Sequence, residues 1–161
     1  MSLNNIIGCI FTENRKIMFS KACEHGIKAV VYIATQSMNG HRVKITEVSE
    51  HTGTPEAFTA KVLGLLSKHN ILHSIKGPYG GFEMDKKQIH ETRLAEIVNA
   101  VDGNQIFTGC ALGLKECNAD KPCPMHNNFV KIRTDLKQMM ENTSIHDLAI
   151  GLISGESILI R

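Results

Sequence analysis

Apolar residues recur at helical spacing along much of this chain. One stripe with spacings i, i+3, i+4 and i+7 predicts a helix that begins at Ser20 and ends in the "MNGHR" stretch; its members are Ile27, Val30, Val31 and Ala34. A second stripe predicts a helix between Thr92 and Gly103, and consists of Leu94, Ile97, Val98 and Val101. A third predicts a long helix over residues 124–141, with Phe129, Ile132, Leu136, Met139 and Met140 on one side. Ser144 and Asp147 can cap a further short turn.

Two short helices are expected between the first two of these. In "KITEVSEHTGTPEAFTAKVLGLLSKHN", Thr46 can cap a helix that runs to about His51. The "TGTP" turn follows, and Pro55 suits the first position of a second helix. The buried stripe of that second helix is Phe58, Val62, Leu65 and Leu66. Two short helices joined by a glycine-containing turn form a helix-turn-helix.

The opposite face of this second helix carries small residues. Glu56, Ala60, Gly64 and Ser67 lie on it, with Ala57 and Thr59 on its flanks. A face meant only for solvent usually carries long, good helix formers. Small residues allow another surface to approach closely, such as the floor of a DNA major groove, although packing against a neighbouring element would also explain them.

The segment "ILHSIKGPYGGFEM" predicts two short strands around a glycine-rich turn. A hairpin directly after a helix-turn-helix is a wing. Lys76 is placed to meet a phosphate, and Tyr79 either packs against the wing or reaches the minor groove. The second helix and the wing together predict that Glu56, Ala57 and Thr59 lie nearest to the base edges. Glu56 can accept a hydrogen bond from a cytosine amino group there.

Composition changes this picture little. The chain has 161 residues, of which 42% are hydrophobic and 21% charged, as expected of an ordinary soluble domain. No apolar run is long enough for a membrane span and no export signal is present, so a cytoplasmic location is expected. Residues 1–17 show no sustained period and are interpreted as an extension. Residues 1–83 carry nine Lys or Arg and six Glu, a net charge of +3, which is compatible with phosphate contact.

Three cysteines and a histidine gather in "GCALGLKECNADKPCPMH". Cys110, Cys117 and Cys123 follow a C-x6-C-x5-C spacing, and His126 comes three residues later. Structural zinc sites usually contain a tighter C-x2-C or C-x4-C knuckle, whereas wider gaps suit a larger group such as an iron–sulfur cluster. A Cys3His zinc site, a reversible disulfide and unliganded thiols remain alternatives. Cys23 lies on the first apolar stripe and is expected in the core, while Cys9 is assigned no role.

The ordered segments "CEHGIKAVVYIA", "TPEAFTAKVLGLLSKHNIL", "KGPYGGF" and "LAEIVNAVDG", followed by the cysteine loop, resemble the Rrf-two family of bacterial transcription regulators. The resemblance implies a mostly α-helical fold with a small β-hairpin wing. It divides the chain into a winged helix-turn-helix domain (18–103), a cysteine-rich loop (104–126), and a dimerisation helix with the C-terminal segment (124–161). The DNA-binding residues expected from motif and resemblance are Thr46, Thr54, Pro55, Glu56, Ala57, Thr59, Ala60, Lys61, Lys76, Tyr79 and Gly80.

The resemblance also implies a homodimer that binds a palindromic operator. The apolar side of the long helix has little remaining domain to cover it, so it is expected to pack on its copy in a second protomer through Phe129, Ile132, Leu136 and Met139.

Cysteine-rich members of the family hold an iron–sulfur cluster at positions that match Cys110, Cys117 and Cys123, so a [2Fe-2S] or [4Fe-4S] cluster is implied here. The first gap is one residue longer than is common in the family, which leaves the nuclearity open. IscR-like members supply a fourth ligand at the position of His126, and NsrR-like members use an acidic residue of the partner protomer at the position of Glu24. We favour His126. The expected function is a repressor that senses redox state, nitric oxide or iron.

An enzyme is not expected, because no glycine-rich nucleotide loop, Ser-His-Asp set or HExxH pattern is present. A small iron–sulfur redox protein is the alternative from another class. The helix-turn-helix and wing favour the regulator.

Overall fold

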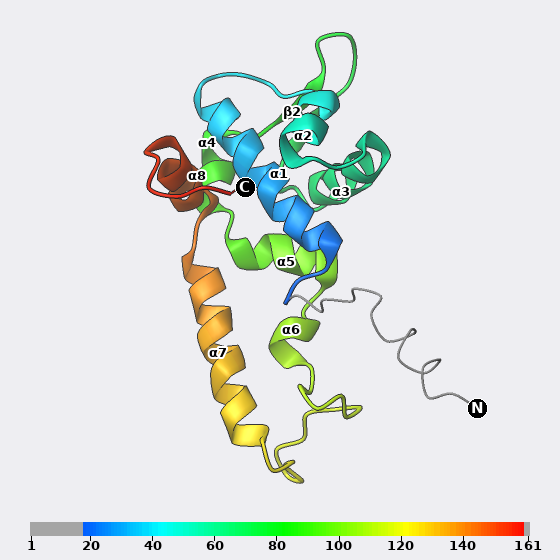
Figure 1. Ribbon diagram of the computed structural model, residues 1–161, viewed down its shortest axis with the longest axis vertical. Helices are drawn as coiled ribbons and strands as arrows, with labels where there is room; N and C mark the ends of the chain where they lie inside the picture. Colours follow the sequence, from blue (N-terminus) through cyan, green and yellow to red (C-terminus); the bar gives the residue numbers. More distant parts are fainter. Residues whose placement is uncertain (1–17, 160–161) are drawn as a thin grey trace, which may run out of the picture.

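The computed structural model describes residues 18–159, so the expected extension over residues 1–17 and Cys9 lie outside the described residues. The elements in chain order are α1 (Lys21–Met38), α2 (Ile45–Thr52), α3 (Glu56–Lys68), β1 (His73–Ile75), β2 (Gly81–Glu83), α4 (Lys86–Glu91), α5 (Leu94–Asp102), α6 (Gln105–Thr108), α7 (His126–Asn142) and α8 (Ile145–Ile153) (Figure 1). The expected fold class, mostly α-helical with a two-stranded antiparallel wing, is confirmed. The short helices α4 and α6 were not predicted.

Local signals fix most helix ends where the sequence predicted them. Ser20 is the N-cap of α1, and its hydroxyl accepts a hydrogen bond from the Cys23 N–H at 3.1 Å. Ser144 and Asp147 form a capping box at the start of α8. Gly103 ends α5 with a positive φ of 73°, a conformation that costs a glycine little. Both ends of α1 and of α5 are therefore within two residues of their expected positions.

The main core surrounds α1, which packs against α3, α5 and α8. Its largest fully buried side chains come from each of these helices and from the segments between them: Ile33, Val30, Val43, Val48, Leu63, Leu66, Leu72, Ile97 and Ile145. The sequence grouped residues 124–161 with the dimerisation helix. The structure instead returns α8 to the winged domain, where Ile145 and Ala149 are buried in the same core.

The wing is a hairpin that pairs His73 with Glu83 and Ile75 with Gly81. Val43 extends it from the α1–α2 connection, because its N–H and C=O exchange hydrogen bonds of 3.0 and 2.8 Å with Phe82. Gly81 has a φ of +150°, and a Cβ there would lie 2.6 Å from the Val43 carbonyl oxygen. This close approach explains why glycine stands at that position.

α6, the cysteine loop and α7 extend away from the winged domain, so the loop lies at the opposite end of the molecule from the wing (Figure 1). α7 runs alongside α5 and α6. A second, smaller cluster of buried residues joins them to α1 and consists of Cys23, Val98 and Met140. Within residues 18–159, no helix combines the length and the apolar character that a membrane crossing requires.

Candidate DNA-binding surface and cysteine loop

The exposed face of α3 is made of small and polar side chains, as the sequence predicts. Glu56, Ala57, Ala60, Lys61 and Gly64 are all exposed. A Cβ added at Gly64 would have no atom within 4 Å, so this face is open to an approaching surface. No element within residues 18–159 packs over it, so packing against a described neighbour does not explain its small residues.

Thr59 was expected on this face, and that prediction is wrong. Its side chain is fully buried, with 0% of its surface exposed. The hydroxyl lies 3.0 Å from the Thr54 hydroxyl, which is also 3.1 Å from His25 Nδ1 and 2.9 Å from the Thr52 hydroxyl. Thr59 and Thr54 therefore connect α3 and the turn before it to α1. They hold the exposed face of α3 in place from the buried side of the helix.

Two expected helix starts are displaced by one or two residues. α2 begins at Ile45 after Lys44, so Thr46 lies within its first turn and is not its cap. The Lys44 N–H instead donates to the Glu47 carboxylate at 2.7 Å, which satisfies that end of the helix. Pro55 occupies the N-cap of α3 rather than its first helical position. Thr46 and Pro55 are both exposed.

The side chains at the wing tip point away from the described chain. Lys76 is exposed and 90% of the Tyr79 surface is exposed, so of the two alternatives for Tyr79, packing against the wing does not occur. Arg42, which the sequence reading missed, anchors this hairpin. Its Nε donates to Glu83 at 2.8 Å and its Nη1 donates to the Tyr79 carbonyl at 3.0 Å. No local sequence motif identifies Arg42, because its partners lie about forty positions further along the chain.

The cysteine loop connects α6 to α7. Cys110, Cys117 and Cys123 are half-buried, and each is a free thiol. The sequence predicted a long helix over residues 124–141, but α7 begins at His126 with Met125 as its N-cap. The His126 N–H donates to the Cys123 carbonyl at 3.0 Å, so residues 123–126 form a separate turn. The thiol of Cys123 therefore precedes this turn and is not at the cap of α7.

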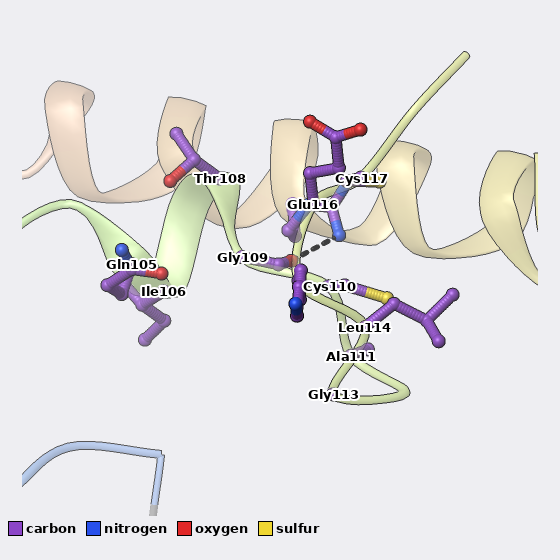
Figure 2. Close-up of a pocket in the computed structure, with 12 residues that line it drawn as sticks. Gln105, Ile106, Thr108, Gly109, Cys110, Ala111, Gly113, Leu114, Glu116 and Cys117 are labelled. Carbon is purple, nitrogen blue, oxygen red and sulfur yellow. Dashed lines mark hydrogen bonds between the residues drawn. The ribbon is translucent and has the colours of Figure 1, made fainter. Parts of the chain in front are cut away.

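Cys117 makes the most side-chain contacts in this loop. Its Sγ lies 3.3 Å from His126 Nδ1 and accepts a hydrogen bond from Arg133 Nη2 at 3.2 Å. Arg133 Nη1 also donates to the Gly109 carbonyl at 2.7 Å. Figure 2 shows Gly109, Cys110 and Cys117 together beside the ribbon of α7.

An open cavity of about 640 Å³ lies here, with Cys110 and Cys117 in its lining. Within residues 18–159, no three His, Cys, Asp or Glu side chains converge closely enough to hold a metal ion. The two lining thiols, with the imidazole against one of them, are soft donors of the kind that iron and zinc bind. The donor set therefore fits a thiolate-bound iron–sulfur cluster or zinc ion, and binding would require the loop to draw its donors together.

Glu24, the rival fourth ligand, lies in the first turn of α1, away from the loop cysteines of its own chain. Its Oε2 pairs with Lys21 at 3.0 Å, whereas its Oε1 is buried without a hydrogen-bond partner among the described residues. The neighbouring Cys23 is fully buried, as predicted. Burial, aided by the nearby Asp102 carboxylate, raises the pKa of the Cys23 thiol to about 12, so this cysteine stays protonated near neutral pH.

These features define a winged helix-turn-helix protein with a cysteine-rich loop beside its long helix. The family model described as an iron-dependent transcriptional regulator, Rrf2, matches residues 19–150. The chain therefore belongs to the Rrf2 family and is a transcription regulator, not an enzyme, as its sequence predicts.

Sequence relatives agree with this assignment. A protein of Aquifex aeolicus (strain VF5) assigned to the HTH-type transcriptional regulators is 30% identical over 135 residues, which cover 82% of this chain and 91% of that protein. The regulator IscR of Sodalis glossinidius (strain morsitans) is 24% identical over 135 residues, covering 84% and 78% of the two chains.

Solved structures show the same fold. CymR, the global cysteine regulator of B. subtilis, superposes with a TM-score of 0.67 at 17% identity and covers 82% of this chain and 95% of its own. T. potens IscR gives a TM-score of 0.66 at 13% identity, covering 86% and 90%.

Proposed function

We propose that this regulator binds duplex DNA as a homodimeric repressor and that an iron–sulfur cluster on its cysteine loop sets its affinity for the operator. One observation carries the proposal. A single chain combines an open small-residue helix face and a wing with an exposed lysine at one end with three thiols at the other (Figure 1). The first end suits DNA binding, and the second suits a redox-active group.

The DNA-binding end consists of α3 and the wing. Ala57, Ala60 and Gly64 allow the helix backbone to approach the floor of a major groove. Glu56, exposed at the start of α3, can accept a hydrogen bond from a cytosine amino group. Lys61 is the cation on the same helix that would meet a phosphate.

The wing adds a second set of contacts. Lys76 would bind a phosphate, Gly80 lets the chain turn tightly behind it, and the exposed Tyr79 ring can enter the minor groove. Thr54 and Thr59 hold the start of α3 in place from behind.

Cys110, Cys117 and Cys123 would bind the cluster through sulfur, with His126 as the fourth ligand. A bound cluster would supply a group that gains or loses an electron and reacts with oxygen or nitric oxide. The 3.3 Å contact between Cys117 Sγ and His126 Nδ1 supports His126, because this imidazole already lies against one of the thiols. Glu24 of a second protomer is the rival ligand, and the observation in its favour is that its Oε1 has no hydrogen-bond partner within residues 18–159.

The homodimer would form along α7. Ile132 and Met139 expose 58% and 50% of their surfaces, and Phe129 is half-buried. Leu136 packs against the smaller buried cluster of its own chain, so it would hold α7 in place behind the interface. A two-fold dimer built on this helix would match a palindromic site. Sedimentation as a monomer at micromolar concentration would contradict this assembly.

The test of the whole proposal is anaerobic purification, followed by absorption spectroscopy and binding to duplex DNA over a series of salt concentrations. We expect a brown protein whose affinity falls steeply with salt and changes when the cluster is removed. A colourless protein with one zinc ion per chain would show that the loop holds a Cys3His zinc site and no cluster. The same Cys117–His126 contact favours that site. An affinity independent of salt would overturn DNA binding.

Single substitutions separate the two ends. Lys76→Ala should weaken binding about equally on all sequences and lower the salt slope by about 1, whereas Glu56→Ala should change which sequence is preferred. Lys87→Ala is the matched control, because Lys87 is an exposed lysine on α4 that pairs with Glu91. His126→Ala should destabilise the cluster while Glu24→Ala spares it, and the reverse result would assign the ligand to Glu24.

A further inference from the structure

In the described chain, Arg133 is the one residue of α7 whose side chain contacts both ends of the loop segment 109–117. From the second turn of the helix its guanidinium donates to the Gly109 carbonyl at 2.7 Å and to Cys117 Sγ at 3.2 Å. These two acceptors lie just before Cys110 and at the second cysteine of the loop. One side chain therefore fastens both ends of the segment 109–117 to α7, and it also lines the cavity beside that segment.

The geometry argues against an incidental surface contact. Both hydrogen bonds are part-buried, and they come from different nitrogens of one planar group, which fixes the orientation of the guanidinium. The rest of the segment offers little else to hold it, because residues 111–116 are all exposed. A lysine could supply the charge but not two separated N–H donors in a rigid plane.

We propose that Arg133 is a positioning residue of the cysteine loop: it holds Cys117 and the Gly109 carbonyl on α7, and its charge raises the reduction potential of a cluster bound through Cys117. The second half rests on the function proposed above, and the first does not. A positive charge and an N–H donor beside a ligating sulfur stabilise the more negative, reduced state, so their loss lowers the potential.

A change at Cys117 would also reach the proposed dimer contact through α7. Arg133 lies on the helix that carries the exposed Ile132, one residue away, so a change at Cys117 would be transmitted to the backbone beside the proposed dimer contact. The loop would then be coupled to assembly through a non-ligand residue.

The experiment compares Arg133→Gln and Arg133→Lys with Lys131→Gln, which removes a charge from an exposed position two residues away on the same helix. Hydrogen–deuterium exchange of the reduced, cluster-free protein tests the positioning role. We expect residues 109–117 to exchange several-fold faster in Arg133→Gln, with Lys131→Gln unchanged. Equal exchange in all three proteins and the wild type would overturn it.

A dithionite titration of the reconstituted protein with redox mediators tests the electrostatic role. Arg133→Gln should reduce the equilibrium constant for one-electron reduction on the order of tenfold, a shift of about 59 mV to lower potential. Arg133→Lys should recover part of that shift but not the slow exchange of the loop. An unchanged potential in Arg133→Gln would overturn the electrostatic role. Failure of the wild type to take up any cluster would overturn the proposed cofactor, and the exchange experiment would still decide the positioning role.

Discussion

The winged domain and the cysteine-loop end of this molecule are built in opposite ways. α1, α3, α5 and α8 enclose a continuous core, and eight residues of α1 alone are buried. Between residues 104 and 139, all of which the structure describes, not one residue is buried. The same chain therefore contains a part that is stabilised by its own interior and a part that is not.

This difference shows where a partner is needed. A domain with a complete core needs no ligand to hold its DNA-binding surface in place. The loop end exposes Leu112, Leu114, Ile132 and Met139, and it gathers three free thiols. Exposed apolar side chains and free thiols together are a liability unless something covers them. A cluster and a second protomer are the occupants we propose.

The sharpest test of the comparison is a pair of truncations. Leu66→Ala in the core should lower the free energy of unfolding by about 2–5 kcal/mol, because it leaves a cavity among fully buried side chains. Leu112→Ala, at a loop position that is 53% exposed, should change it by less than about 0.5 kcal/mol. Urea unfolding of the cluster-free protein measures both. Similar losses in the two variants would mean that the loop end has a core of its own.

The second test uses the cysteines themselves. In reduced, cluster-free protein we expect iodoacetamide to label Cys110, Cys117 and Cys123, and to label Cys23 roughly 100-fold more slowly or less. Cys23 is fully buried and its pKa is raised to about 12, mainly by burial, so reaction requires the core to open.

Peptide mass spectrometry resolves each cysteine separately, and labelling in 6 M guanidinium is the control. Rapid labelling of Cys23 in the native protein would show that the smaller cluster around Met140 is loose.

The amphipathic pattern predicts the winged domain well, because its helices bury one stripe each in a shared core. α1, α3, α5 and the wing all lie close to their expected positions. Thr59 is the instructive failure. Threonine reads as a small polar residue suited to an exposed flank, yet its hydroxyl is satisfied by Thr54, which the turn places beside it. A wheel diagram of one helix contains no information about that partner.

The loop end is predicted less well for a physical reason. Cys117, His126 and Arg133 are brought together by a turn over residues 123–126 that no periodic pattern specifies. The cysteine spacing identifies the donors but not their arrangement. The return of α8 to the core was missed because its apolar residues are equally suited to a partner's surface.

A third prediction concerns the junction between α1 and the helix-turn-helix, where His25 is buried. Burial, followed by the charge of Lys28, lowers the pKa of His25 from its usual 6.5. The unfolded chain therefore binds a proton that the folded chain resists, so His25 lowers stability progressively as the pH falls below about 6.5 towards its folded value. Neutral His25 carries no such penalty above that range.

His25→Gln keeps a polar group near Thr54 but does not titrate. We expect the stability of the wild type relative to this variant to decrease between pH 7 and pH 5, measured by urea midpoints at each pH. His51, whose pKa burial also lowers, titrates in both proteins and cancels in the comparison. Parallel pH profiles would show that His25 accepts a proton without cost, and that this part of the core admits water.

The smallest expected effect tests where the well-packed part of the molecule ends. Arg42 and Glu83 form a 2.8 Å ion pair at the base of the wing, and about one third of each side chain is exposed. Such a pair contributes about 0.2–1 kcal/mol, so Arg42→Met should barely change global stability. Because Arg42 also holds the Tyr79 carbonyl, the amides of Lys76, Gly77, Tyr79 and Gly80 should exchange faster with deuterium. Lys87→Met, which breaks the exposed 3.8 Å pair with Glu91, should leave those amides unchanged. If Arg42→Met instead costs more than about 2 kcal/mol, the wing is part of the folding core. The wing tip would then belong to the part of the molecule that has its own core, and not to the segments that move freely to meet DNA.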